Sequence, residues 1–115
     1  MKESYRNIYI FNNNFLSNEE QMKLLELLYS DDDDLKNIVA WKLVLANIGL
    51  IHDVVMGFLK HNCKVDYDDL MSLGIIGAFR SIDKYDSSKG KLSTFLSSCV
   101  KNCILGPLRY IPTHP

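Results

Sequence analysis

Apolar side chains recur at helical spacing through most of the chain, and polar clusters interrupt them. Such patterns cover residues 22–29, 34–46, 48–60 and 66–104, where apolar positions return every three or four residues. The pattern predicts an all-α fold, a compact bundle of about four to five helices. Residues 1–15 mix apolar side chains with three asparagines, which leaves open a short helix or an extended arm.

Polar residues that stabilise helix N-termini precede the first two segments. Ser17 and Glu20 have the spacing of a capping box. The aspartates at 31–34 predict a solvated linker that also caps the second helix. A calcium loop is the alternative, but its alternating ligands and its glycine are missing. The apolar face of the second helix is expected to comprise Leu35, Ile38, Val39, Trp41 or Lys42, and Leu45.

Residues 66–104 predict two helices joined by a tight polar turn at 86–90. The apolar face of the first helix is expected to comprise Leu70, Leu73, Ile76 or Gly77, and Ile82. Gly74 and Gly77 allow another backbone to come close, at a cost of roughly 1 kcal/mol each relative to alanine. The second helix is expected to be capped by Ser93 or Thr94. It should end before Pro107, which lacks an amide hydrogen and clashes with the preceding turn.

This central stretch carries a recognisable order of motifs. They are D-D-L-M-S-L-G-I-I-G-A-F-R-S-I-D-K-Y-D at 68–86, K-G-K-L-S-T-F at 89–95, and Ile104, Leu105, Leu108 and Arg109 beyond them. The order resembles region 2 of the sigma-70 family of bacterial RNA polymerase sigma factors. The S-L-G at 72–74, Cys99 and Asn102 are most similar to the late sporulation sigma factors of Gram-positive bacteria. The resemblance implies a helical bundle of the region 2 type.

The resemblance implies a surface that docks onto the clamp coiled coil of the largest catalytic subunit of RNA polymerase core. The matching positions are Ile48, Ile51, Asp69, Ser72, Leu73, Ile75 and Phe79. Such a contact needs an apolar centre with polar anchors at its rim. Gly49 stands where the family usually carries Arg, and Leu73 where primary sigma factors carry an acidic residue. Docking is therefore expected to be more apolar and less sensitive to salt.

The resemblance also implies that the chain holds the non-template strand of the promoter −10 element. Flipped bases need apolar or aromatic pockets, with cations nearby for phosphates. The matching positions are Lys91, Leu92, Thr94, Phe95, Ser98, Cys99, Lys101 and Asn102. Phe95 replaces the family's Tyr and keeps a stacking face, whereas Ser98 and Cys99 replace a pair of Trp, which predicts weak duplex opening. The alternative is that Leu92 and Phe95 are core residues of the last helix.

Length, hydrophobic content and charge indicate what class of protein this is. A chain of 115 residues that is 47% hydrophobic with a formal charge of −1 predicts one soluble globular domain. No apolar run approaches the length of a membrane span, so we expect a cytoplasmic protein without a membrane partner. Residues 79–115 carry six basic and two acidic residues, which suits a face for phosphate. A merely uneven spread of surface charge remains the alternative.

Nothing in the sequence predicts a cofactor, a metal site or catalysis. Cys63, Cys99 and Cys103 form no C-x-x-C pair and are expected to be buried reduced thiols. The chain shows no nucleophile–base pair and no phosphate-binding glycine loop. We therefore expect a binding protein and not an enzyme.

The resemblance divides the chain into an arm and helix upstream of region 2 (1–33), a region 2-like domain (34–110) and a tail (111–115). We also expect that the C-terminal helix-turn-helix domain of the family is missing. Three hypotheses follow. The first is a sigma module that binds polymerase and promoter DNA, and the second is a degenerate or split sigma-like regulator that binds polymerase or a partner sigma subunit without melting DNA. An anti-sigma factor is a further candidate partner. The third is an unrelated small helical domain that binds DNA or protein.

Overall fold

The computed structural model describes residues 16–61 and 64–108, and every regular element in these ranges is helical. The helices are α2 (Asn18–Leu27), α3 (Asp33–Ala46), α4 (Ile48–Leu59), α5 (Tyr67–Ser81) and α6 (Leu92–Leu108). Two short 3-10 turns, η1 (Ile82–Lys84) and η2 (Ser87–Lys89), connect α5 to α6. The predicted all-α bundle is therefore confirmed. The prediction for residues 1–15, a short helix or an extended arm, concerns a segment outside the described residues.

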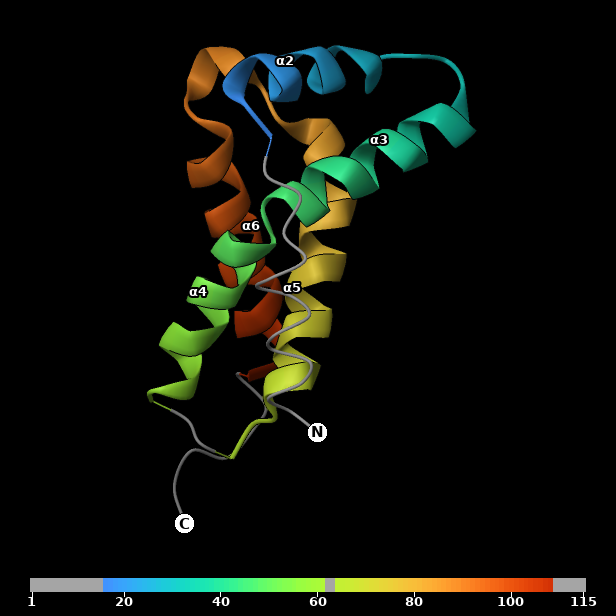
Figure 1. Ribbon diagram of the computed structural model, residues 1–115. Helices are drawn as coiled ribbons and strands as arrows, with labels where there is room; N and C mark the ends of the chain where they lie inside the picture. Colours follow the sequence, from blue (N-terminus) through green and yellow to red (C-terminus); the bar gives the residue numbers. More distant parts are fainter. Residues whose placement is uncertain (1–15, 62–63, 109–115) are drawn as a thin grey trace.

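The helices form an elongated bundle (Figure 1). α5 and α6 run antiparallel along its length with α4 beside them, and each of these three helices contacts the other two. α2 lies across one end, and α3 descends from that end at an angle to α5. The connection between α5 and α6 therefore lies beneath α2.

Both predicted N-terminal capping devices are present. The Ser17 hydroxyl accepts from the Glu20 amide and the Glu20 carboxylate accepts from the Ser17 amide, each at 3.2 Å. The Asp32 carboxylate accepts from the amides of Asp34 and Leu35 at 3.0 and 3.2 Å. Each cap satisfies amides that the first helical turn leaves without partners. The aspartate run thus caps α3, as predicted.

The core lies where α3, α4, α5 and α6 meet. Its fully buried side chains are Leu43, Val44, Ile51, Val55, Met71, Ala78, Leu96, Val100 and Ile104. The predicted close approach at the two glycines of α5 is confirmed. A methyl group on Gly74 would lie 2.8 Å from Ile51 Cγ2, and one on Gly77 would lie 2.7 Å from Cys103 Cβ. The glycines therefore let α4 and α6 pack directly on the backbone of α5.

This packing confirms most of the predicted apolar face of α5 and corrects that of α3. On α5 the predicted Leu70, Gly77 and Ile82 are buried, whereas Leu73 is half-buried and Ile76, the alternative to Gly77, is 43% exposed. The glycine side of α5 is the buried one because it faces α4 and α6. On α3 the buried residues are Val39, Ala40, Leu43 and Val44. Of the residues predicted for that face, only Val39 is buried.

The predicted ends of α6 were also wrong. The helix begins at Leu92, before Ser93 and Thr94, and it continues through Pro107 to Leu108. A proline in the last turn removes one amide, which would have bonded to the carbonyl of the residue four positions earlier. The rest of α6 keeps its hydrogen bonds and its packing, so the helix persists.

One further observation concerns helix length. In the part of the chain that the structure describes, no single helix is long and apolar enough to cross a membrane; α3 and α4 reach that length and composition only as a pair bent by 58° at their junction.

Candidate nucleic-acid and docking interface

A groove of about 330 Å³ lies between the α5–α6 connection and the first turns of α6. We call it the basic–aromatic groove; its lining residues are Lys84, Tyr85, Asp86, Lys89, Gly90, Lys91, Thr94, Phe95 and Ser98. It brings together four of the residues predicted to contact DNA: Lys91, Thr94, Phe95 and Ser98.

Hydrogen bonds within the connection shape this groove. The Tyr85 hydroxyl donates to the Gly90 carbonyl at 2.6 Å, which closes the loop on itself. Gly90 has a φ of 144°, a conformation that residues with a side chain rarely adopt. The Asp86 carboxylate accepts from the Ser88 amide at 2.9 Å and from its hydroxyl at 2.7 Å. The connection is therefore an ordered element and not a loose linker.

Aromatic rings form one wall of the groove. The rings of Tyr85 and Phe95 lie 5.5 Å apart with a tilt of 52°. Phe95 is half-buried and packs against the core, so it serves the core and also presents a face to the groove. The two alternatives for Phe95 are thus compatible in this structure.

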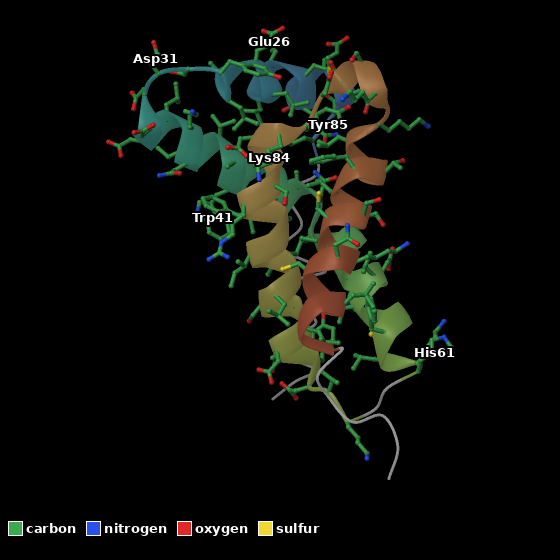
Figure 2. The ribbon with its side chains drawn as sticks, turned by 180° about the vertical axis from the view of Figure 1, so that it is seen from behind. Glu26, Asp31, Trp41, His61, Lys84 and Tyr85 are labelled. Carbon is green, nitrogen blue, oxygen red and sulfur yellow. The ribbon has the colours of Figure 1, made fainter. Side chains whose placement is uncertain are left out.

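Charged side chains surround the rings, with three lysines and one aspartate in the lining. The hydroxyl and amide of Ser88, together with the charge of Lys89, hold the pKa of the Asp86 carboxyl below its usual value. Asp86 is therefore ionised at neutral pH, and the charged lining has a positive excess. Figure 2 shows Lys84 and Tyr85 together at the connection.

The other predicted DNA contacts lie outside the groove. Leu92 is half-buried and lines a hollow of about 370 Å³ beneath α2, together with Asn47. Lys101 lines a hollow of about 620 Å³ between α4 and α6. Cys99 is half-buried and Asn102 is exposed. The structure thus separates the eight predicted residues into one cluster and four scattered positions.

Five groove residues are not among the predicted DNA contacts: Lys84, Tyr85, Asp86, Lys89 and Gly90. Three of them lie in the predicted turn at 86–90, and Lys84 and Tyr85 directly precede it. The alternation of lysines with an aromatic residue across these positions is typical of surfaces that bind single strands. That alternation was the signal that could have found them.

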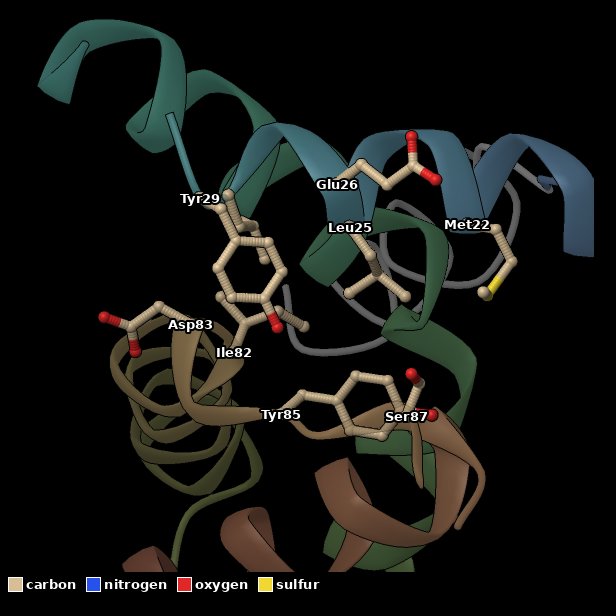
Figure 3. Close-up of a pocket in the computed structure, with 9 residues that line it drawn as sticks. Met22, Leu25, Glu26, Tyr29, Ile82, Asp83, Tyr85 and Ser87 are labelled. Atoms are coloured by element: carbon tan, nitrogen blue, oxygen red, sulfur yellow. The ribbon is translucent and has the colours of Figure 1, made fainter. Parts of the chain in front are cut away.

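A smaller pocket of about 170 Å³ lies between α2 and the connection (Figure 3). Leu25 and Met22 line the underside of α2, with Tyr85 and Ser87 opposite them. Tyr85 also lines the basic–aromatic groove. Tyr85 therefore lies between α2 and the groove.

The residues predicted to dock on polymerase divide into two groups. Asp69 and Ser72 are exposed, and Leu73, Ile75 and Phe79 are half-buried; we call these five the α5 face. Ile48 and Ile51 are 2% and 0% exposed. Their side chains belong to the core beside α5, so they present no surface to a partner, and we exclude them from the docking surface.

Trp41 extends this region onto α3. Its ring stacks on Phe79 with centroids 4.4 Å apart and planes 26° from parallel. Trp41 remains 42% exposed and lies beside α5 on the side away from α6 (Figure 2). The sequence placed Trp41 on a core face, and its spacing gave no means to recognise the stack.

The cysteines and other metal-binding side chains form no cluster in the described ranges. Cys99 and Cys103 are free thiols and half-buried, whereas Cys63 lies outside the described residues. Among residues 16–61 and 64–108, no group of three or more His, Cys, Asp and Glu side chains could hold a metal ion.

Known proteins match most of the chain. The family model described as Sigma-70 region 2 matches residues 43–110. The chain is 36% identical over 107 residues to an RNA polymerase sigma-28 factor of Bacillus thuringiensis subsp. kurstaki, which covers 90% of this chain and 43% of that protein. It is 36% identical over 101 residues to the RNA polymerase sigma-K factor of Bacillus subtilis, with coverage of 84% and 32%.

A third relative extends this range of organisms. An RNA polymerase sigma-E factor of Clostridium acetobutylicum is 33% identical over 95 residues, with coverage of 82% of this chain and 38% of that protein. No solved structure gives a significant match. The chain spans between 32% and 43% of the length of these three relatives. The family model and these identities show that the chain belongs to the sigma-70 family, whose region 2 it contains.

Proposed function

We propose that this chain is a transcription initiation module that docks on bacterial RNA polymerase core and holds the non-template strand of the promoter −10 element. The basic–aromatic groove is the observation that carries the proposal. The same role implies a binding function without catalysis, and a place in the cytoplasm, where bacterial polymerase works.

The groove has the chemistry that an unpaired strand requires. A base can stack on the ring of Phe95 or Tyr85, because every base has a π face. The three lysines of the lining stand where phosphates on either side of that base would need cations. A volume of about 330 Å³ lies at the lower end of the usual range for ligand pockets, which suits one base better than a larger ligand.

The α5 face supports the polymerase contact. Its centre is apolar through Leu73, Ile75 and Phe79, and its polar anchors are Asp69 and Ser72. An apolar centre with a polar rim is the usual composition of a protein interface. The relatives, which are named as RNA polymerase factors, favour the same partner.

Replacing Lys89 and Lys91 together by alanine should weaken binding of single-stranded −10 DNA several-fold. The plot of log affinity against log salt concentration should also become less steep, by about 0.7 for each phosphate contact that is lost. Fluorescence anisotropy with a labelled oligonucleotide at four salt concentrations measures both quantities. The matched control is Lys23→Ala with Lys42→Ala, which removes two exposed lysines from α2 and α3.

An unchanged salt slope in the groove variant would remove the DNA role. The second candidate, a regulator that binds polymerase without opening DNA, would then lead. One observation already favours that candidate in part. Ser98 in the groove and the half-buried Cys99 supply no bulky ring to separate a base pair.

Leu73→Asp tests the polymerase contact. A carboxylate placed in a desolvated contact lowers affinity because it loses water without gaining a partner. We expect the dissociation constant for purified core polymerase to rise at least about fivefold. Leu105→Asp, at a leucine of α6 that is 38% exposed, is the control and should bind like wild type. Equal affinities for all three proteins, with unfolding temperatures that agree, would contradict docking through the α5 face.

A further inference from the structure

An open hollow of about 620 Å³ lies between α4 and α6, and we call it the α4–α6 hollow. The apolar side chains that line it are buried or half-buried, whereas Asp53, His61 and Lys101 are exposed. Its full lining is Leu50, Asp53, Val54, Gly57, Phe58, His61, Ser97 and Lys101. An apolar floor with charged side chains around it suits contact with another protein segment.

Gly57 keeps the space above α4 open. Glycine inside a helix destabilises that helix relative to alanine. At Gly74 and Gly77 the loss is offset, because α4 and α6 pack on the backbone of α5 there. A methyl group on Gly57 would meet no described atom within 4 Å, so packing within the described chain does not account for this glycine. The hollow therefore has room for side chains from a further segment.

The N-terminal arm, residues 1–15, is connected to α2 beside this hollow. Near the start of α2, the Gln21 side chain accepts a hydrogen bond from the side-chain amide of Asn47 at 3.4 Å. Asn47 directly precedes α4, and Leu50, three residues further on, lines the hollow. The chain therefore enters α2 close to the end of the hollow where α4 begins.

The sequence of the arm fits an apolar floor if the arm is helical. Tyr5, Ile8 and Phe11 are three residues apart, so they share one side of a helix, and Arg6 and Ile10 fall on the opposite side. A helix over residues 1–11 is about 15 Å long, and α4 extends about 12 Å from Leu50 to Phe58. One helix of this length therefore covers the hollow.

We propose that residues 1–11 form a helix that occupies the α4–α6 hollow, with Tyr5, Ile8 and Phe11 packed on its floor. Residues 12–14 are asparagines, which favour turns, and they let the chain reverse from this helix into α2. The arm then covers the side of α4 that α5 and α6 leave exposed. The occupant is the chain itself, so this inference does not depend on the proposed function.

Hydrogen exchange of the full chain tests whether the arm is docked. The backbone amides of residues 4–11 should exchange at least about tenfold more slowly than in an unstructured peptide of the same sequence. Ile8→Asp should remove this protection, because it places a carboxylate against the apolar floor. Ile10→Asp is the matched control: it makes the same change on the opposite side of the helix and should keep the protection. In an extended arm Ile8 and Ile10 share one side, so equal loss of protection in both variants overturns the proposed helix.

Gly57→Trp tests the hollow itself. Its ring occupies the open space above α4, so it should displace the arm and return residues 4–11 to the exchange rate of the unstructured peptide. The amides of α4 should stay protected, which shows that the bundle is intact. Gly106→Trp is the control, because a methyl group there also meets no described atom within 4 Å and Gly106 does not line the hollow. A methyl group alone, as in Gly57→Ala, is too small to displace the arm.

The results decide between docking in this hollow and its alternatives. Protection that Ile8→Asp and Gly57→Trp abolish, and that both controls keep, establishes the arm as the occupant. A wild-type arm that exchanges like the unstructured peptide overturns the inference, and so does protection that persists in Gly57→Trp. Protection that falls on dilution of the protein shows that the arm docks on a second copy, which overturns the intramolecular contact. These measurements use neither polymerase nor DNA, so their result is separate from that of the proposed function.

Discussion

Gly77→Ala should lower the free energy of unfolding by about 1–3 kcal/mol, the usual cost of forcing an extra methyl group into a packed core. Alanine stabilises a helix by about 1 kcal/mol relative to glycine, so the loss must come from packing. The added methyl carbon would lie 2.7 Å from Cys103 Cβ and 3.0 Å from its sulfur. Cβ is fixed by the backbone of α6 and cannot rotate away. The two helices must therefore separate or shift.

Gly57 provides the matched control. It lies on α4, and a methyl group there would meet no heavy atom within 4 Å. Gly57→Ala should therefore raise the free energy of unfolding by about 0.5–1 kcal/mol. Urea unfolding followed by circular dichroism measures both variants. If both substitutions change the free energy of unfolding in the same direction, α5 and α6 do not approach each other as closely as the structure shows.

Phe95→Leu should weaken binding of single-stranded −10 DNA by about 5- to 150-fold. Leucine keeps the apolar contacts that Phe95 makes with the core but has no flat ring. Stacking of one base on an aromatic side chain contributes about 1–3 kcal/mol, which corresponds to this range of affinity. The effect should be nearly independent of salt, because no cation is removed. Anisotropy titrations at two salt concentrations check both points.

Two conservative variants serve as controls for Phe95→Leu. Phe95→Tyr keeps the ring and should bind DNA like wild type. Tyr85→Phe also keeps its ring but loses the hydrogen bond to the Gly90 carbonyl, so any loss of affinity reports the ordering of the connection. A Phe95→Leu protein that binds DNA as tightly as Phe95→Tyr would exclude stacking at this position.

Local features were predicted well because they depend on residues close in sequence. The capping box at Ser17, the cap supplied by the aspartate run and the close approach at Gly74 and Gly77 all follow from short spacings. The family resemblance likewise rests on short motifs, and the family model confirms it. Four of the eight residues predicted to contact DNA line one groove because they lie close together in the sequence.

Features that depend on the orientation of one helix against another were not predictable. The apolar residues of α3 occupy two sides of the helix, and only packing against the other helices decides which side is buried. Ile48 and Ile51 matched docking positions of the family, yet α4 turns them into the core. Proline at 107 looked like a terminator, but tertiary contacts along the preceding turns of α6 outweigh one lost hydrogen bond.

The antiparallel pairing of α5 and α6 also bears on the order in which the chain folds. These neighbours in sequence are separated only by the connection, and they contact each other more extensively than any other pair of helices. Closing a short loop costs little chain entropy, and local contacts form before distant ones. The α5–α6 hairpin is therefore the natural nucleus, onto which α4 and α3 can dock. A packing defect beside Gly77 would then affect the first step of folding and not the last.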